Sequence, residues 1–376
     1  MKVLFNATTL VMGGALQVAV SFIKQSLLDS EIHWCYALSK EVYSELSDEE
    51  KSLLASKCSV FEVSPSRSKS SRNLLRSLED KYSVDVVFTL FGPAYTKFHK
   101  PHVCGVADGW VTHSSLLAFK SLDSPSAAFK MLATMVYKAI WYRKSNVWIV
   151  EASNAKAGLI KRLYLQSSSI HVVKNTCGQH FFDMQMSPPE LSKLQKVRIL
   201  CMSAYYPHKN LEIIPEVLKH LSTDLEHIEF EFVITLPFDS SGYLKLMEEA
   251  KVLGVDRNIC NLGYVKVDDA ASIYEQCHIV FLPSLLETFS ANYPEAMATK
   301  RPIVTTDLSH AHAACQDAAL YFDPTDAKSA ASKIIELVKD PKLLLRIVQS
   351  GENVLMSLPT PQERFNQYIK ILKSIN

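Results

Sequence analysis

Short runs of β-branched and aromatic residues alternate with longer amphipathic stretches along this chain, and the alternation occurs twice. In the first half the short runs lie at residues 3–5, 32–38, 60–63, 84–90, 102–106 and 147–150. The stretches with helical spacing between them lie at 16–28, 41–55 and 72–82. Strands that alternate with helices are typical of βαβ units, in which helices cover both faces of a parallel sheet. This half therefore predicts a doubly wound α/β domain.

The same pattern restarts near residue 197. Strands are predicted at 197–202, 228–235, 259–262, 279–282, 302–305 and 319–322, and helices at 210–221, 241–253, 341–357 and 361–375. The polar segment 184–196, which contains Pro188 and Pro189, suits a linker. We therefore expect a first domain at 1–183, a second at 197–357, and a terminal helix at 358–376 that packs back on the first. Two such domains would face each other across a cleft lined by the carboxyl ends of their strands.

Length and charge are consistent with two globular domains and exclude one class of partner. The chain has 376 residues, about twice to three times the size of a common domain. Forty basic and thirty-nine acidic residues leave a net charge of +1, which argues against nucleic-acid binding through bulk positive charge. The eight cysteines contain no CxxC pair and lie mostly in apolar segments, so we expect reduced, buried thiols in a cytoplasmic protein.

Two segments raise the question of a membrane. Residues 3–23 carry no charge, but polar residues and glycines interrupt the apolar run, so a buried strand, a turn and a helix are predicted there. Residues 127–150 combine apolar and aromatic side chains with four cations. On a helix this pattern gives either a face that lies on a membrane surface or a core-packed helix with a solvated rim, and the residues alone favour the second.

The first candidate site motif is Gly13-Gly14, between a predicted strand and a predicted helix. Glycines at this place let a ligand approach the backbone, and the amides of the following helix favour an anion. The motif is not GxGxxG, which disfavours an NAD-dependent dehydrogenase, and a plain strand-to-helix turn explains it equally well.

The second motif is the segment 203–210, SAYYPHKN, which also follows a strand. We expect Lys209 at the start of a helix, where its ammonium could neutralise a diphosphate without a metal. An exposed lysine in a first turn is usually just solvated. The positive end of the helix dipole disfavours a cation there, and this mild conflict slightly favours a functional role for Lys209.

The third motif is the strongest and places two carboxylates eight residues apart. In FLPSLLETFSANYPEAM, Glu287 is expected in the loop before a helix that starts near Ser290, and Glu295 in its second turn. Free amides around Phe289–Asn292 would then face a phosphate, while the two carboxylates would accept hydrogen bonds from sugar hydroxyls. Two unrelated surface glutamates are the alternative, but their place after a buried strand argues against chance.

The frame PSLLETFS…PEAM resembles the E-x7-E element of retaining GT-B glycosyltransferases, in particular glycosyltransferase family 4 (group 1). The stretch that starts at Arg301, RPIVTTDLSHAHAACQDAALYFDPTDAKSAASKI, the Gly-Gly turn and the segment VVKN at 172–175 are similar to that family as well. The resemblance is dense over 197–340 and looser before 150. It implies the GT-B fold, two Rossmann-like domains facing across a cleft.

The resemblance also implies roles for individual residues. Glu295 would bind the ribose of a nucleotide-sugar donor, Glu287 the donor sugar, and Lys209 the diphosphate. The remaining expected donor contacts are Gly13, Gly14, Ser203, Thr288, Phe289 and Ser290. The family usually has an arginine where this chain has Ala204, so one phosphate-binding cation is missing.

In the first domain many relatives place a histidine where this chain has Asp108. Asp108 is therefore the candidate for positioning the acceptor or the reacting sugar, and it completes the predicted catalytic set with Glu287 and Lys209.

The implied reaction is a transfer that retains the anomeric configuration, with no metal and no other cofactor. The donor would be a UDP- or GDP-sugar and the acceptor a glycan or polyprenyl-linked glycan of a surface polysaccharide such as O-antigen or capsule. This context favours a cytoplasmic protein that is peripheral at the inner face of the membrane, and it makes contact through 129–149 as plausible as the core-packed interpretation. A sugar-nucleotide epimerase, a phosphorylase and a non-catalytic nucleotide-sugar-binding protein of the same fold remain as alternatives.

Overall fold

The computed structural model describes residues 1–225 and 227–375. The chain forms two compact units. Unit 1 contains residues 1–114, 124–178 and 359–376, and unit 2 contains residues 115–123 and 179–358. The predicted boundary between the first domain and the linker was 183/184, whereas the structure changes unit after Gly178. The predicted linker segment belongs to unit 2 and includes the start of that unit's first strand.

Unit 1 is built on a parallel seven-stranded sheet in the order β3-β2-β1-β4-β5-β6-β7. Its strands are β1 (Lys2–Ala7), β2 (His33–Ser39), β3 (Cys58–Phe61), β4 (Val86–Thr89), β5 (His102–Gly105), β6 (Val147–Val150) and β7 (Ile170–Val172). Its helices are α1 (Gly14–Leu28), α2 (Lys40–Ser44), α3 (Asp48–Leu54), α4 (Lys69–Lys81), α5 (Gly109–His113), α7 (Pro125–Tyr142), α8 (Ser153–Leu163) and α17 (Pro361–Lys373).

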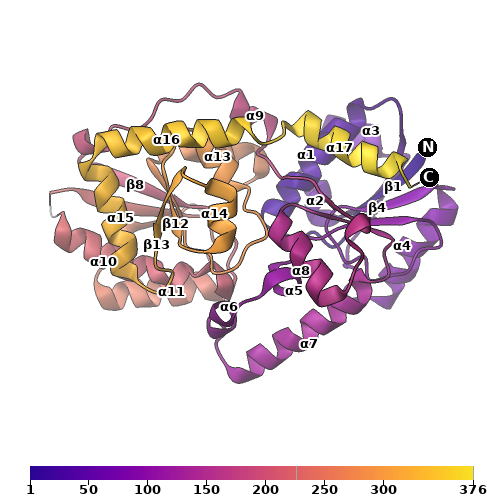
Figure 1. The fold of residues 1–376 in the computed structure, drawn as a ribbon, viewed down its shortest axis with the longest axis horizontal. Helices are drawn as coiled ribbons and strands as arrows, with labels where there is room; N and C mark the ends of the chain where they lie inside the picture. The colour runs from indigo at the N-terminus through magenta and orange to yellow at the C-terminus, as the bar shows by residue number, and fades with distance from the viewer. Residues whose placement is uncertain (226, 376) are drawn as a thin grey trace. The chain divides into compact units, whose positions relative to one another are not determined.

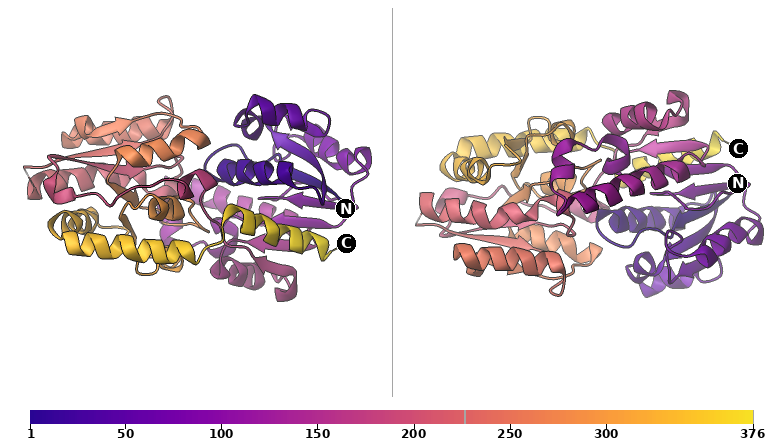
Figure 2. Two further views of the ribbon diagram at one scale, coloured as in Figure 1. Left: turned by 90° about the horizontal axis from the view of Figure 1, so that it is seen from above. Right: turned by 90° about the horizontal axis from the view of Figure 1, so that it is seen from below.

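Unit 2 repeats this plan with a parallel six-stranded sheet in the order β10-β9-β8-β11-β12-β13. Its strands are β8 (Lys196–Cys201), β9 (Glu229–Ile234), β10 (Ile259–Asn261), β11 (Ile279–Leu282), β12 (Ile303–Thr306) and β13 (Ala319–Phe322). Its helices are α6 (Leu116–Lys120), α9 (Gln179–Phe182), α10 (Ile214–Asp224), α11 (Ser241–Leu253), α12 (Ala270–Gln276), α13 (Asn292–Ala298), α14 (Ser309–Cys315), α15 (Ala327–Lys339) and α16 (Pro341–Met356). Figure 2 shows helices on both faces of each sheet, which confirms the predicted fold class.

The strand order of each sheet reverses at one place. In unit 1 the chain runs outward from β1 in one direction and continues from β4 in the other, and in unit 2 the same happens at β8 and β11. Ligands of open α/β sheets bind at such a switch point, outside the carboxyl ends of the strands. The loops that follow β8 and β11 are therefore expected to form the site of unit 2.

The last helix, α17, belongs to unit 1 and lies beside α1 (Figure 1). Its start is fixed by Thr360, which forms a capping box with Glu363. The ring of Phe365 packs against Phe22 of α1 with a centroid distance of 5.1 Å, and the ring of Tyr368 packs against the same phenylalanine at 5.8 Å. The first and last parts of the chain therefore share one core.

Several local predictions are wrong in detail. The single helix expected at 41–55 is two helices, α2 and α3, because Ser47 forms a capping box with Glu50 and starts a new helix. The helix expected from residue 210 begins as a 3₁₀ turn and becomes the α-helix α10 only at Ile214. The short strand β7 was not predicted from the sequence.

The segment 127–150 also differs from the core-packed helix that its residues alone favoured. Ser124 caps the helix α7 and Pro125 occupies its first turn. However, Tyr142 is the one buried residue described for its eighteen positions. No helix among residues 1–225 and 227–375 is both long and apolar enough to cross a membrane.

Candidate active site

The loops after β8 and β11 bring two of the predicted residues together. These strands are neighbours in the sheet of unit 2, with Ile279 paired to Ile199 and Val280 to Leu200. The loop after β8 ends in a 3₁₀ turn, Pro207–Lys209, and Leu285 donates a backbone hydrogen bond to His208 across the two loops, at 2.8 Å. A backbone hydrogen bond thus links the two loops.

Lys209 and Glu287 form an ion pair between these loops. The ammonium of Lys209 contacts Oε1 of Glu287, and the two side chains are 19% and 13% exposed. The hydroxyl of Ser284 donates a second hydrogen bond to the same oxygen, at 3.2 Å. The predicted carboxylate and the predicted diphosphate-binding cation are therefore neighbours, although Lys209 lies in a 3₁₀ turn and not at the start of an α-helix.

The charges around Glu287 keep its carboxyl ionised. Burial favours the neutral form, but the Lys209 ammonium, with smaller contributions from His310 and His208, holds the pKa of Glu287 below its ordinary value. The unit thus presents a fixed carboxylate beside a fixed ammonium. Such a pair can orient sugar hydroxyls at one end and phosphate oxygens at the other.

Glu295 lies in α13, as expected, and is nearly fully buried with 2% of its surface exposed. The hydroxyl of Tyr274, which belongs to α12, donates a hydrogen bond of 2.7 Å to Oε2 of Glu295. Tyr274 was missed by the sequence reasoning, because one tyrosine in an amphipathic helix carries no signal of what its hydroxyl reaches. It fixes the orientation of a carboxylate that the prediction assigned to a ribose.

The helix after Glu287 starts slightly later than predicted. It begins at Asn292 and has seven residues, and the amide of Tyr293 already donates to the carbonyl of Ser290 at 3.2 Å. The side chain of Asn292 donates to the carbonyl of Met202, at the end of β8, with a distance of 2.5 Å. Thr288 is buried, whereas Phe289 and Ser290 are partly exposed in the loop before the helix. Their contacts with a donor stay predictions.

Ser203 lies in the same unit, two residues after the end of β8, and its hydroxyl donates to the carbonyl of Ala204 at 2.9 Å. Ala204 carries no charge. In the described loops after β8 and β11, Lys209 is the cation that contacts Glu287. Among residues 1–225 and 227–375, no cluster of three histidine, cysteine or acidic side chains could hold a metal ion. The predicted lack of a cofactor stays a prediction.

The predicted residues of unit 1 lie at the carboxyl ends of its strands. Gly13 has a φ of 74°, a left-handed conformation that favours glycine, and immediately precedes α1, so this turn has a structural reason for its first glycine. Gly14 is the first residue of that helix and is exposed. The structure leaves the donor role of both glycines as a prediction.

Asp108 follows β5 and caps the short helix α5. Its Oδ1 accepts a hydrogen bond from the amide of Val111 at 3.2 Å, and its Oδ2 accepts one from the ammonium of Lys138 at 2.8 Å. The carboxylate is 10% exposed. Asp108 therefore has a structural role that explains an aspartate at this position, and its catalytic role remains a prediction.

The thiols add no further chemistry. All eight cysteines lie in the described part of the chain; none of them forms a disulfide there, and six are buried. Burial raises the pKa of the Cys104 and Cys201 thiols to about 12, so these side chains stay protonated and act as small apolar groups.

A known protein family matches most of unit 2. Residues 185–354 match the protein family described as "Glycosyl transferases group 1". Over 193 residues the chain is 23% identical to the O-antigen chain mannosyltransferase RfbU of Salmonella typhimurium, a match that covers 51% of this chain and 50% of that protein. It is 22% identical over 285 residues to the mannosylfructose-phosphate synthase of Agrobacterium fabrum, which covers 70% of this chain and 60% of the synthase. The chain thus spans about half to three-fifths of the length of these relatives.

A solved structure matches both units. The structure of Anabaena HepE in complex with UDP and glucose superimposes with a TM-score of 0.71 at 16% identity, and the match covers all of both chains. At this identity the likeness defines the fold. Residues 185–354 therefore match a group 1 glycosyltransferase domain, and the chain as a whole has the GT-B fold.

Proposed function

We propose that this protein is a retaining glycosyltransferase that transfers a sugar from a nucleoside-diphosphate sugar to a lipid-linked glycan. The observation that carries the proposal is the ion pair between Lys209 and Glu287 in the loops after two adjacent strands, at the switch point of a group 1 domain. Unit 2 would bind the donor, and unit 1 would supply the acceptor site. Comparison with HepE, whose structure contains UDP, supports a nucleotide-sugar donor with uracil as the first base to test.

In the proposed mechanism, unit 2 stabilises the leaving group. The bond between the anomeric carbon and the diphosphate oxygen breaks, and the acceptor hydroxyl forms the new bond on the same face. The departing phosphate oxygen takes the proton of that hydroxyl, so no separate base is required. Lys209 would offset the negative charge that develops on the diphosphate, an electrostatic contribution that acts in a site shielded from water.

The other residues would orient the substrates. Glu287 would accept hydrogen bonds from the donor sugar, because its carboxylate is ionised and fixed by Lys209 and Ser284. Glu295, held by Tyr274, would accept hydrogen bonds from the two ribose hydroxyls. Asp108 would position the acceptor or the reacting sugar. Surface polysaccharide synthesis is the proposed context, supported by the 23% identity to an O-antigen mannosyltransferase.

The location proposed for this activity is the inner face of the cytoplasmic membrane. A polyprenyl-linked acceptor keeps its lipid in the bilayer, so the enzyme must reach the membrane surface without crossing it. Of the predicted contact segment 129–149, Trp148 and Ile149 are buried in β6, so the part proposed for this contact is the exposed face of α7.

Saturation-transfer NMR with UDP-, GDP- and ADP-sugars tests the proposal on the wild type, on Glu295→Ala and on Glu248→Ala. Glu248 is an exposed carboxylate of α11 and provides a matched control. We expect one class of donor to bind, the Glu295 variant to lose binding, and the Glu248 variant to keep it. If no donor binds, or if binding ignores Glu295, the assignment of the two carboxylates is wrong.

A measurement of turnover then distinguishes a glycosyltransferase from a non-catalytic binding protein and from an epimerase. After a donor is found, product NMR with a glycan acceptor reports the anomeric configuration, and retention is expected. Binding without turnover would favour a non-catalytic binding protein, and epimerisation of the donor sugar at C2 without an acceptor would favour an epimerase.

A further inference from the structure

We propose that unit 1 docks on an anionic lipid surface through an apolar ridge on α7 and a row of cations on α4. The inference deepens the proposed function and rests on it for the expectation of a lipid-linked acceptor. The surface itself is defined by the exposure and the charge of side chains in unit 1, and its binding to lipid can be measured without any sugar.

The apolar ridge consists of Phe129, Leu132, Val136 and Ile140. Between 50% and 74% of the surface of each side chain is exposed. A helix turns about 100° per residue, so Phe129, Val136 and Ile140 lie within about 20° of one line along α7, and Leu132 lies about 60° away. Four large apolar side chains thus share one exposed face of a single helix, which is the arrangement of an interfacial helix.

The opposite face of α7 packs against the rest of unit 1, and its contacts decide which cations of the helix are available to a lipid headgroup. Tyr142 is buried, and the ammonium of Lys138 is bound to Asp108 at 2.8 Å, which directs this cation toward the protein. Lys138 is therefore removed from the set of basic residues that the sequence suggested for membrane contact. Lys130, Arg143 and Lys144 remain exposed.

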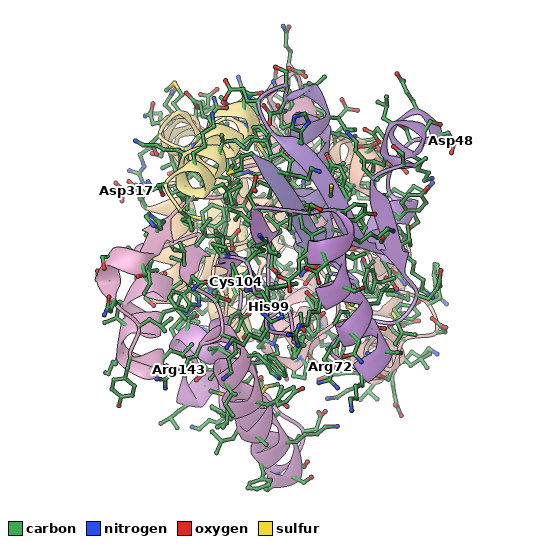
Figure 3. The ribbon with its side chains drawn as sticks, turned by 90° about the vertical axis from the view of Figure 1, so that its right-hand side faces the viewer. Asp48, Arg72, His99, Cys104, Arg143 and Asp317 are labelled. Carbon is green, nitrogen blue, oxygen red and sulfur yellow. The ribbon has the colours of Figure 1, made fainter. Side chains whose placement is uncertain are left out.

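The ridge has no negative charge near it along the chain. Residues 124–150 contain four cations and no aspartate or glutamate. Lys130 lies toward one edge of the exposed face, and Arg143 and Lys144 follow its C-terminal end. Figure 3 shows α7 with its side chains projecting outward, and with Arg143 and Arg72 labelled on either side of it.

The second part of the proposed docking surface lies on α4, so the sequence of α7 does not reveal it. The guanidinium of Arg72, in α4, donates to the hydroxyl of Tyr137 in α7 at 3.4 Å. Tyr137 also stacks on Tyr95 with a centroid distance of 5.8 Å, so the helix is held against the body of unit 1 on this side. One turn after Arg72, the exposed Arg76 contacts His99. Arg72 is half-buried beside α7 and Arg76 is exposed one turn further along α4, so the two arginines form a short basic row on this helix.

The loop next to this row adds cations. Lys97 and Lys100 are exposed on either side of His99, and the carboxylate of Glu79 is buried under the same loop, where it accepts hydrogen bonds from the amides of His99 and Lys100. A cationic border beside an apolar face matches an anionic bilayer, which offers phosphate groups at the surface and acyl chains below them.

Two other occupants fit this surface less well. A second copy of the chain that packed ridge on ridge around a twofold axis would place the like charges of the two helices near each other. A nucleic acid would neutralise the cations but would leave four large apolar side chains without an apolar partner. An anionic lipid surface offers partners both to the cations and to the apolar ridge.

Vesicle co-sedimentation of the full chain tests the proposal. The vesicles are phosphatidylglycerol with phosphatidylethanolamine, and pure phosphatidylcholine is the neutral comparison. We expect binding to the anionic vesicles that weakens with salt, and weak binding to the neutral ones. Phe129→Ser/Val136→Ser/Ile140→Ser should lower the apparent affinity at least tenfold. Arg72→Gln/Arg76→Gln should lower it by up to roughly 30-fold, since each cation near an anionic surface contributes about 1 kcal/mol.

Matched variants in unit 2 control for non-specific effects. Leu244→Ser/Val252→Ser removes two exposed apolar side chains from α11, and Lys251→Gln/Arg257→Gln removes two exposed cations. Both should bind vesicles like the wild type, and circular dichroism and thermal unfolding should show that every variant is folded. The proposal is overturned if the ridge variant binds as well as the wild type, or if the controls weaken binding equally.

Sedimentation velocity and donor binding complete the test. A dimer of the wild type that the ridge variant loses would identify the ridge as a contact between copies and would also overturn the proposal. Because the vesicle assay contains no donor and no acceptor, failure of lipid binding and failure of donor binding are separate results. The ridge variant is expected to bind the nucleotide sugar as the wild type does.

Discussion

The ammonium of Lys209 contacts the carboxylate of Glu287, and 78 residues separate the two in the chain. Each side chain belongs to a loop that follows a strand, and the two strands are neighbours at the place where the strand order reverses. The pair is mostly shielded from solvent and lies next to Ser284. The structure thus brings the two predicted residues together, and their roles in donor binding stay predictions.

Removing one member of this pair should destabilise unit 2 more than removing both. Lys209→Met leaves the Glu287 carboxylate shielded without its cation, and we expect a loss of about 3 kcal/mol in the free energy of unfolding. Lys209→Met/Glu287→Leu should recover most of the loss, because no uncompensated charge remains. Urea unfolding measures both. Lys300→Met is the control, because its pair with Glu352 is about one-third exposed and should contribute less than about 1 kcal/mol.

The coupling within the pair should depend on pH with a defined sign. The pKa of Glu287 lies below its ordinary value in the folded protein, so the stabilisation is complete above that ordinary value and is lost as the pH falls through the folded pKa. A double-mutant cycle measured at pH 7 and again in acid should show the coupling shrink. A coupling that is already absent at pH 7 would contradict the ion pair.

Tyr274 should support donor binding through Glu295. Tyr274→Phe removes the hydroxyl that holds Oε2 of Glu295, and we expect donor affinity to fall several-fold while the protein loses about 1 kcal/mol of stability. Tyr293→Phe is matched, since its buried hydroxyl lies 3.0 Å from that of Thr305. The control should lose similar stability and keep donor affinity. Equal donor affinities in the two variants would argue that Glu295 needs no support from Tyr274.

Two substitutions at Asp108 separate its structural role from the proposed catalytic one. Asp108→Asn keeps an oxygen that can cap α5 but removes the charge paired with Lys138, so stability should change by less than about 1 kcal/mol. Asp108→Ala loses the cap as well and should cost about 1 kcal/mol more. If Asp108 positions a substrate, both variants should lower kcat at least tenfold. Activity that follows stability alone would leave Asp108 with its structural role.

His102 should make unit 1 less stable in mild acid. Its ring is buried between Thr89 and Ser145, and burial lowers its pKa to about 3. The unfolded chain binds a proton below about pH 6.5 while the folded chain does not, so stability falls as the pH drops from about 6.5 toward 3. Between pH 7 and pH 5 this residue should cost about 2 kcal/mol.

His102→Gln provides the comparison for this effect. The variant has no titrating ring, so its unfolding free energy should change less between pH 7 and pH 5 than that of the wild type. Chemical unfolding at the two pH values gives the difference directly. Parallel pH profiles of the two proteins would show that the histidine is already accessible to protons in the folded state.

The sequence identified most elements of both sheets, because each strand is a short apolar run bounded by helices. The sequence predictions were wrong where a capping residue or a single backbone angle interrupted a helix although the spacing of apolar residues continued. Ser47 interrupts the stretch 41–55 and starts α3, although the spacing of apolar residues continues across it. The segment 207–213 forms two 3₁₀ turns before α10 because Asn210 adopts a left-handed conformation. Such choices depend on side-chain hydrogen bonds and on single backbone angles that periodicity does not record.

What the sequence determined by itself is the repeated strand-helix order and the carboxylates at 287 and 295, since both are properties of spacing along the chain. The tertiary structure decided which distant groups meet. Lys209 reaches Glu287 because the parallel strands β8 and β11 align the loops that follow them at one edge of the sheet. Tyr274 reaches Glu295 because the fold brings α12 close to α13. It also decided which face of α7 is exposed: the same apolar residues could pack in a core or lie at a surface, and only the packing of Tyr142 and Lys138 against unit 1 leaves the ridge outward.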